Sequence, residues 1–123
     1  MKTKEEIQRY IVETMKECIL AKTRYQNAKH SKSIKKKLYL YNKMQELHTR
    51  FDNLIYVHKL RRDMKNTDEI REKIDNLVDE LMKEIKELHK ASNDFNQDKI
   101  EEIDKRIQIY YDRIQTLKWV MEE

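Results

Sequence analysis

The sequence predicts an all-α protein, an elongated up-down antiparallel helical bundle or coiled coil of about four helices in one domain, 1–123. The 123 residues include no glycine and no proline. Tight hairpin turns depend on these residues, so a fold of many short strands is excluded, as are glycine-rich phosphate loops. Apolar residues also recur at spacings of three and four, which places them on one face of a helix.

The first helix is expected at about 4–28, and its apolar stripe is the weakest of the four. Met15 and Ile19 lie beside this stripe rather than on it. Cys18 is the one cysteine, so it cannot form an intramolecular disulfide, and its place on the stripe predicts a buried thiol. The stripe consists of Ile7, Ile11, Cys18, Ala21, Tyr25 and Ala28.

The second helix is expected at about 33–64. Its stripe is out of phase with that of the first helix across the segment KHSKS, 29–33, where serines are available as helix caps. The alternative is a single rod of about 60 residues, roughly 90 Å long, that needs a partner chain to cover its stripes. The second stripe consists of Leu40, Met44, Leu47, Phe51 and Leu54, with His58 in the next position.

The third helix is expected at about 67–91. Asn66 is placed to cap its first turn, with Glu69 in the position of a capping box. Glu84 interrupts an otherwise apolar stripe. The stripe consists of Ile70, Ile74, Leu77, Leu81, Leu88, Ala91 and Phe95.

The fourth helix is expected at about 97–122, after a phase break across SNDFNQD, 92–98. Its stripe is the most regular, because seven successive positions at alternating spacings of three and four are all apolar, as in a coiled coil. These positions are Ile100, Ile103, Ile107, Tyr110, Ile114, Leu117 and Met121.

Charge is distributed unevenly along the chain. Residues 29–65 carry eleven basic and three acidic side chains, whereas residues 66–123 carry ten basic and sixteen acidic ones. We expect antiparallel packing of the second helix on the third to neutralise the two segments and to select the register. This packing would join Lys35–Lys37 to Asp94 and Asp98, and Arg61 and Arg62 to Glu69 and Glu72.

The alternative use of the basic charge is an external polyanion. On a helix, four cations and one aromatic residue fall on one line that is broken by Glu46. Such a line predicts contacts with a phosphate backbone, with the tyrosine stacking on a base. The candidate nucleic-acid-binding residues are Lys32, Lys36, Tyr39, Lys43 and Arg50.

Apolar and aromatic residues of the last helix also lie off its main stripe: Ile109 and, as the candidates for a binding site, Tyr111, Trp119 and Val120. Tyrosine and tryptophan are frequent anchors in protein interfaces, so these residues are the candidate partner-binding site. The alternative is that the bundle itself needs a broad apolar face and buries them.

No pattern of catalytic or metal-binding residues is present. The histidines lack the spacing of a zinc site, and we expect no cofactor, no metal and no enzymatic activity. Arg24 and His30 are spaced in a way similar to the pair in HEPN ribonucleases, which are also helical. Only these two residues match, and Tyr25 departs from the polar residue usual in that family, so no catalytic role is assigned to them.

We therefore expect a small non-enzymatic protein–protein interaction module, such as an adaptor, an accessory protein or an inhibitor, that binds another protein or itself through helix faces. The alternative is a nucleic-acid-binding accessory protein that uses the basic second helix. Abundant Lys, Ile, Asn and Tyr are typical of a low-GC genome, including that of a phage or mobile element. The first residues show no signal peptide, and no apolar run in the sequence is long enough to span a membrane. A cytoplasmic location is therefore expected, with no membrane or small-molecule partner, and secretion by a route that needs no cleaved signal is the alternative.

Overall fold

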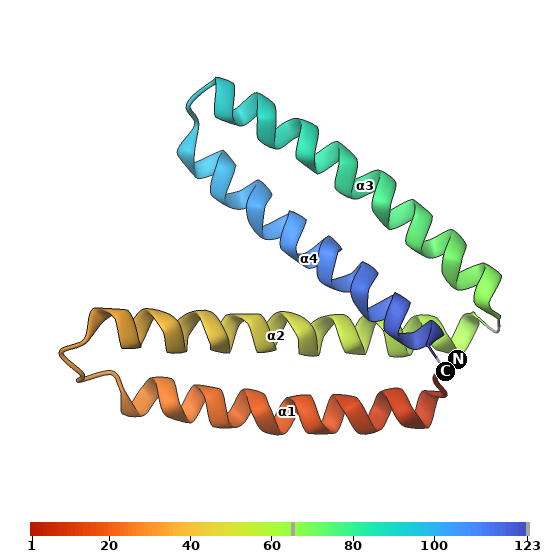
Figure 1. Ribbon diagram of the computed structural model, residues 1–123, viewed down its shortest axis with the longest axis horizontal. Coiled ribbons are helices and arrows are strands. Elements are labelled where there is room, and N and C mark those ends of the chain that lie inside the picture. The colour runs from red at the N-terminus through yellow and green to blue at the C-terminus, as the bar shows by residue number, and fades with distance from the viewer. Residues whose placement is uncertain (65, 123) are drawn as a thin grey trace.

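The computed structural model describes residues 1–64 and 66–122, and it contains four α-helices and no strand within them. The predicted all-α class is confirmed, and every helix begins and ends within two residues of its predicted boundary. The single rod is wrong, because the chain turns at 28–33. The helices are α1 (Lys4–Asn27), α2 (Ile34–Asp63), α3 (Thr67–Asn93) and α4 (Gln97–Met121) (Figure 1).

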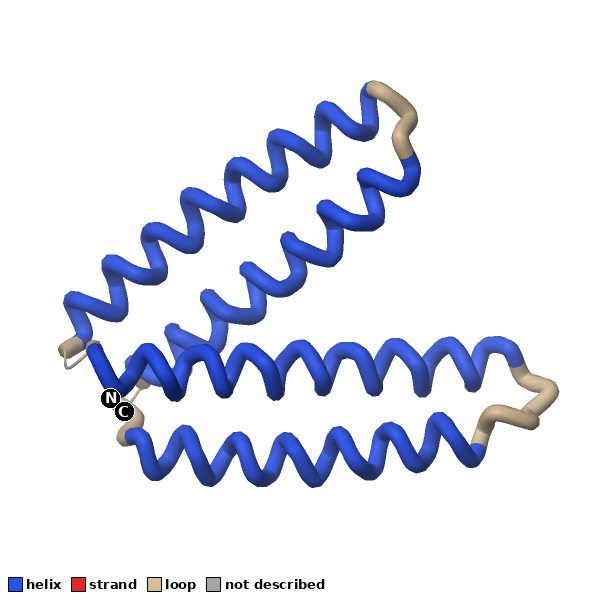
Figure 2. Tube along the Cα trace, turned by 180° about the vertical axis from the view of Figure 1, so that it is seen from behind, coloured by secondary structure: helices blue, strands red, loops and turns tan. Residues whose placement is uncertain are grey.

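The helices form two antiparallel hairpins, which we call the α1–α2 arm and the α3–α4 arm. The arms meet where α2 packs against α4, and we call this region the junction. Beyond the junction the arms diverge, so that each arm ends in its own turn, far from the turn of the other (Figures 1 and 2). The start of the chain lies beside the end of α4 at the junction, where the Lys2 N–H donates to the Val120 carbonyl oxygen (Figure 2).

The expected packing of α2 on α3 is wrong, because α2 packs mainly on α1 and α4. Lys35–Lys37 begin α2 at the free end of one arm, whereas Asp94 and Asp98 lie at the free end of the other. At the junction, Arg61 donates from Nε to the Lys2 carbonyl oxygen (3.2 Å) and from Nη1 to that of Met64 (2.7 Å). The two charged segments therefore do not neutralise each other along their lengths.

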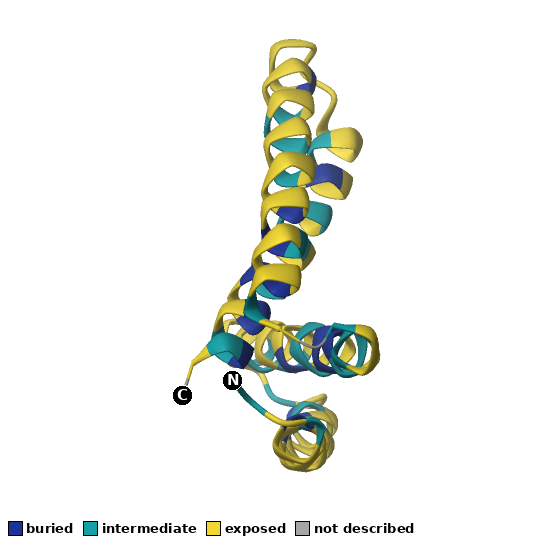
Figure 3. Cartoon of the chain, turned by 90° about the vertical axis from the view of Figure 1, so that its right-hand side faces the viewer, coloured by how far each residue is buried: buried dark blue, intermediate teal, exposed yellow. Residues whose placement is uncertain are grey.

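The largest apolar core lies at the junction, and all four helices contribute to it. Figure 3 shows buried residues along the contact between paired helices and exposed residues over most of the remaining ribbon. Burial of apolar side chains is the main favourable term in folding, so the junction is expected to supply most of the stability. The core residues are Ile7, Val57, Ile70, Ile74, Leu77, Ile114, Leu117 and Val120.

A polar contact within the junction joins α2 to α4. The buried Asn53 donates from Nδ2 to Oδ2 of Asp112 (2.8 Å) and accepts at Oδ1 from Nε of Arg113 (2.8 Å). The Arg113 guanidinium also lies over the Tyr56 ring, 4.3 Å from its centroid. Because an unpaired buried polar group is costly, these directional bonds select one way for the arms to cross.

Polar side chains cap the start of each helix. The predicted cap of α3 is confirmed, since Asn66 Oδ1 accepts from the backbone N–H of Glu69 at 2.9 Å. Thr3, Ser33 and Asn96 cap the other three helices in the same way. These contacts satisfy backbone donors that have no partner within the helix.

Helix α3 ends in a Schellman turn that carries Phe95 at a left-handed φ of 54°. The Phe95 N–H donates to the carbonyl of Ser92, and the Asn96 N–H donates to that of Ala91. Glycine is the usual residue at this position, and the chain has none. The prediction that Phe95 continues the apolar stripe is wrong, because its side chain is 92% exposed.

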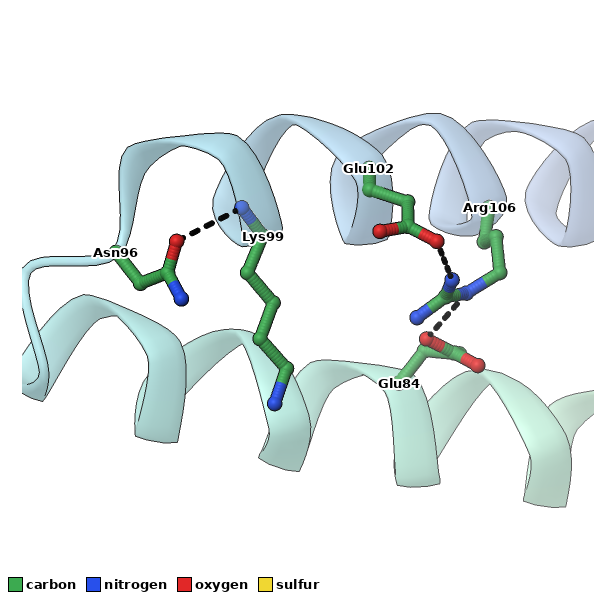
Figure 4. Close-up of polar contacts among 5 residues, drawn as sticks. All are labelled: Glu84, Asn96, Lys99, Glu102 and Arg106. Carbon is green, nitrogen blue, oxygen red and sulfur yellow. Dashed lines mark hydrogen bonds and ion pairs between the residues drawn. The ribbon is translucent and has the colours of Figure 1, made fainter.

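Glu84, which interrupts the apolar stripe of α3, forms an ion pair with α4. Glu84 Oε2 accepts from Nε of Arg106 at 3.0 Å, and Glu102 Oε1 accepts from Nη1 of the same guanidinium at 3.0 Å (Figure 4). The hydrogen bond to Glu84 is the main reason that the pKa of Arg106 is raised. Figure 4 also shows the cap of α4, in which Asn96 accepts from the Lys99 N–H.

Candidate functional site

A pocket of about 570 Å³ opens between α1 and α2, on one side of the α1–α2 arm. Its walls are mainly apolar, and Met15 and Ile19, which lie beside the main stripe of α1, form part of them. The lining residues are Met15, Cys18, Ile19, Lys22, Met44, Gln45, His48 and Phe51.

Exposed apolar residues extend this pocket along the arm at helical spacings. On α1, Val12 continues the row of Met15 and Ile19, and on α2 a row begins at Ile34, which is 78% exposed. An apolar surface of this extent is typical of a site that another macromolecule covers. We call it the groove face, and its residues are Val12, Met15, Ile19 and Lys22 on α1, with Ile34, Leu38, Tyr41, Met44, His48 and Phe51 on α2.

Cys18 lies in the pocket as a half-buried thiol, which is less buried than the stripe predicted. Burial raises the pKa of the thiol, and the carboxylates of Glu17 and Asp52 raise it further. Because the thiolate is the reactive form, this environment does not produce a nucleophile at neutral pH.

The other side of the same arm carries part of the predicted nucleic-acid-binding line. Tyr39 and Lys43 line a second pocket of about 410 Å³ together with Leu20 of α1. Lys36 is exposed on α2, whereas Lys32 precedes this helix. The remaining members of this pocket are Glu17, Ala21, Arg24, Leu40 and Leu47.

Arg50, the last residue of the predicted line, lies nearer the junction than the others. Its Nη2 pairs with Oε1 of Glu46 at 3.5 Å. The structure therefore groups Lys36, Tyr39 and Lys43 on the outer part of α2, and it places Arg50 in an internal contact.

The free end of the α1–α2 arm carries basic side chains without acidic ones. Residues 18–45 include eight lysines and arginines and no aspartate or glutamate. None of the eight forms an ion pair with another residue in the described part of the chain. Helix α2 also lacks an acidic residue in its first turn, although α1 and α3 each have two and α4 has one. The positive charge of this segment, which we call the basic end, is therefore available to an external group.

The three candidate partner-binding residues occupy different environments. Val120 is 1% exposed and belongs to the core, and Trp119 packs on Tyr10 with ring centroids 4.9 Å apart. Tyr111 is exposed and lines a pocket of about 420 Å³ between α2 and α4. Of the three, Tyr111 is the most exposed, Trp119 is half-buried and Val120 is buried.

Other candidate chemistry is sparse in the described residues. No three His, Cys, Asp or Glu side chains among them lie close enough together to hold a metal ion. Arg24 is in the last turn of α1, and His30 is exposed in the turn that follows. No helix in 1–64 or 66–122 is long and apolar enough to cross a membrane.

These features define the chain as an all-α protein of two helical hairpins with an open apolar surface on one of them. The chain matches no protein-family model, and no significant match is found among curated proteins or solved structures.

Proposed function

We propose that the protein is a non-enzymatic protein–protein interaction module that acts through helix faces, as an adaptor, an accessory protein or an inhibitor. The groove face is the observation that carries this proposal. It presents methionine, branched aliphatic and aromatic side chains over a concave surface, and methionines at such surfaces adapt to partner side chains. Tyr111 is a secondary contact point beside the junction.

The abundance of Lys, Ile, Asn and Tyr supports an origin in a low-GC cell or in a phage or mobile element that infects one. We also propose that the protein binds its partner in the cytoplasm.

Two neighbouring residues of α1 provide a matched test. Ile19 and Leu20 are 59% and 55% exposed, but Ile19 lines the groove face and Leu20 lines the pocket on the other side. We expect the wild-type protein and Leu20→Asp to retain the same protein in affinity capture from the native cell, and Ile19→Asp to lose it. Equal retention by all three baits, or retention of no protein, contradicts the proposal.

A second candidate function is nucleic-acid binding, and the observation that favours it is the basic end. A partner that neutralises several phosphates binds less tightly as the salt concentration rises. Salt-sensitive retention on heparin and on single-stranded RNA is expected to be lost in Lys32→Glu/Lys36→Glu/Lys43→Glu. The control is Lys83→Glu/Lys86→Glu/Lys90→Glu on the other arm, which makes the same change in net charge at exposed positions. Equal effects of the two triple variants would exclude a specific site on α2.

A further inference from the structure

We propose that the groove face is covered by a second copy of the same chain, with the two α1–α2 arms packed face to face and antiparallel. This inference rests on the proposed function, because it names the partner of the groove face. The paired arms form a four-helix bundle at the centre of a dimer with twofold symmetry, and the α3–α4 arms extend from its two ends. In such an isologous interface each copy contributes the same surface.

The position of the pocket on the arm favours a second copy over an unrelated occupant. Helix α1 spans 4–27 and α2 spans 34–63, so their midpoints fall near residues 15 and 48. Met15 and His48 both line the pocket. An antiparallel twofold arrangement places the middle of one arm on the middle of the other. The pocket of one copy therefore meets the pocket of the next, and each set of apolar walls covers the other.

The size of the whole side of the arm that carries the groove face also fits an interface between two copies. Helix α1 has 24 residues, so the arm is about 36 Å long. With helices about 9 Å apart, a two-helix face is about 19 Å wide and offers about 700 Å². This area is close to the roughly 800 Å² that each partner contributes to an interface of standard size.

Charge determines the direction of the pairing. A parallel arrangement would bring together two basic ends, each with eight cations and no carboxylate over residues 18–45. An antiparallel arrangement instead places each basic end near the junction of the other copy, where α3 begins (Figure 1). Residues 66–82, the first part of α3 and its cap, carry six acidic and two basic side chains, and they offset the cations at the end of α2, Lys59, Arg61 and Arg62. Like charges brought together at an interface are unfavourable, so the antiparallel arrangement is selected.

The chain cannot cover this surface itself in the fold observed. Helix α4 meets α2 through the side that carries Asn53 and Val57, whereas Met44, His48 and Phe51 lie on a different side of α2. A nucleic acid would neutralise the lysines but would leave the rows of Met15, Ile19 and Met44 in water. A second copy covers these apolar rows and also keeps the two basic ends apart.

The first experiment is sedimentation equilibrium of the purified protein at about 100 μM, at which a dimer with a Kd of about 1 μM is largely formed. We expect a mass of twice 15.3 kDa for the wild type and for Leu20→Asp, and a mass of 15.3 kDa for Ile19→Asp. Circular dichroism establishes that the two variants remain helical. A monomeric wild type, or a dimer that Ile19→Asp leaves intact, overturns the proposal.

The second experiment determines whether the two α1–α2 arms of the dimer run antiparallel or parallel. A spin label at Ser31, in the turn of the α1–α2 arm, is introduced into a Cys18→Ala background. The antiparallel dimer is expected to give a distance between copies of about 36 Å or more, the length of one arm. A distance near 10 Å, the spacing of packed helices, shows a parallel pair and overturns the proposed arrangement.

These results separate the inference from the proposed function. If the purified protein is monomeric but captures another protein through Ile19, the second copy is excluded and the interaction module remains. If the protein neither dimerises nor captures a partner through this face, both proposals fail.

Discussion

The two arms are built from helices of similar length, yet they differ in how completely they bury their apolar residues. In the α3–α4 arm, both helices bury large aliphatic residues of their stripes, and Arg106 joins Glu84 across the pair. In the α1–α2 arm, α1 packs through the small side chains of Thr14, Ala21 and Ala28 and leaves Met15 and Ile19 beside the contact. The comparison shows that a regular apolar stripe determines which helices pair. The residues beside the stripe determine how much apolar surface stays exposed after pairing.

The largest expected effect is on the free energy of unfolding, and it differs between the junction and the free end of the α1–α2 arm. Leu117→Ala removes a side chain that is fully buried in the core, and we expect the free energy of unfolding to fall by about 3 kcal/mol. The same change at the half-buried Leu40 is expected to cost about 1 kcal/mol, because less surface and a smaller cavity are involved. Urea denaturation measures both values. Equal losses would contradict a core concentrated at the junction.

The next effect concerns the polar contact between the arms. Asn53→Ala leaves Asp112 and Arg113 without their buried partner, so we expect the free energy of unfolding to fall by about 2 kcal/mol. Asn42→Ala, at an exposed position of the same helix, is the control and is expected to change stability little. Thermal unfolding followed by circular dichroism compares the two, and similar melting temperatures would show that Asn53 does not stabilise the crossing.

A smaller effect, of opposite sign, is expected at the turn of the α3–α4 arm. Phe95→Gly removes the cost of a left-handed conformation at a residue whose side chain is almost entirely in solvent. We expect an increase in the free energy of unfolding of about 1 kcal/mol. Phe95→Ala is the matched control, because alanine retains the unfavourable φ and should give no comparable gain. A destabilised Phe95→Gly protein would show that the aromatic ring makes a stabilising contact.

The smallest effect is on the reactivity of Cys18, which lines the pocket between α1 and α2. Burial and two carboxylates raise the pKa of Cys18, so the thiolate fraction at any pH below that pKa is smaller than for a free thiol. Alkylation by iodoacetamide is expected to rise with pH along a curve displaced to higher pH than that of free cysteine. Glu17→Gln should move the curve part of the way back. A thiol that reacts as fast as free cysteine would contradict the placement of Cys18 in an apolar groove.

Much of the helical structure follows from the sequence because it depends on local physics. The apolar spacing gives the four helices, and Asn66 could be identified as a cap from its position before Glu69. The divergence of the arms could not be predicted, since a stripe on α2 does not specify which neighbour covers it. Asn53 in particular resembles any polar residue beside a stripe, and its partners lie about 60 residues away.

The candidate surface was only partly predictable. Lys36, Tyr39 and Lys43 could be placed on one line by helical spacing alone, and Met15 and Ile19 could be seen to lie beside the stripe of α1. That these two residues form a pocket with Met44 and Phe51 depends on how α1 and α2 pack. Trp119 and Val120 illustrate the opposite case, because the junction needs the apolar residues that lie off the main stripe of α4.

The distance between the free ends of the two arms tests their divergence most directly. Spin labels at Ser31 and Asp94, one in the turn of each arm, are placed in a Cys18→Ala protein and diluted with unlabelled chains so that distances between copies do not contribute. We predict a distance distribution centred well beyond about 10 Å, the separation of helices packed side by side. A distribution centred near that spacing would show that the arms close into one compact bundle, which would contradict the two-arm structure.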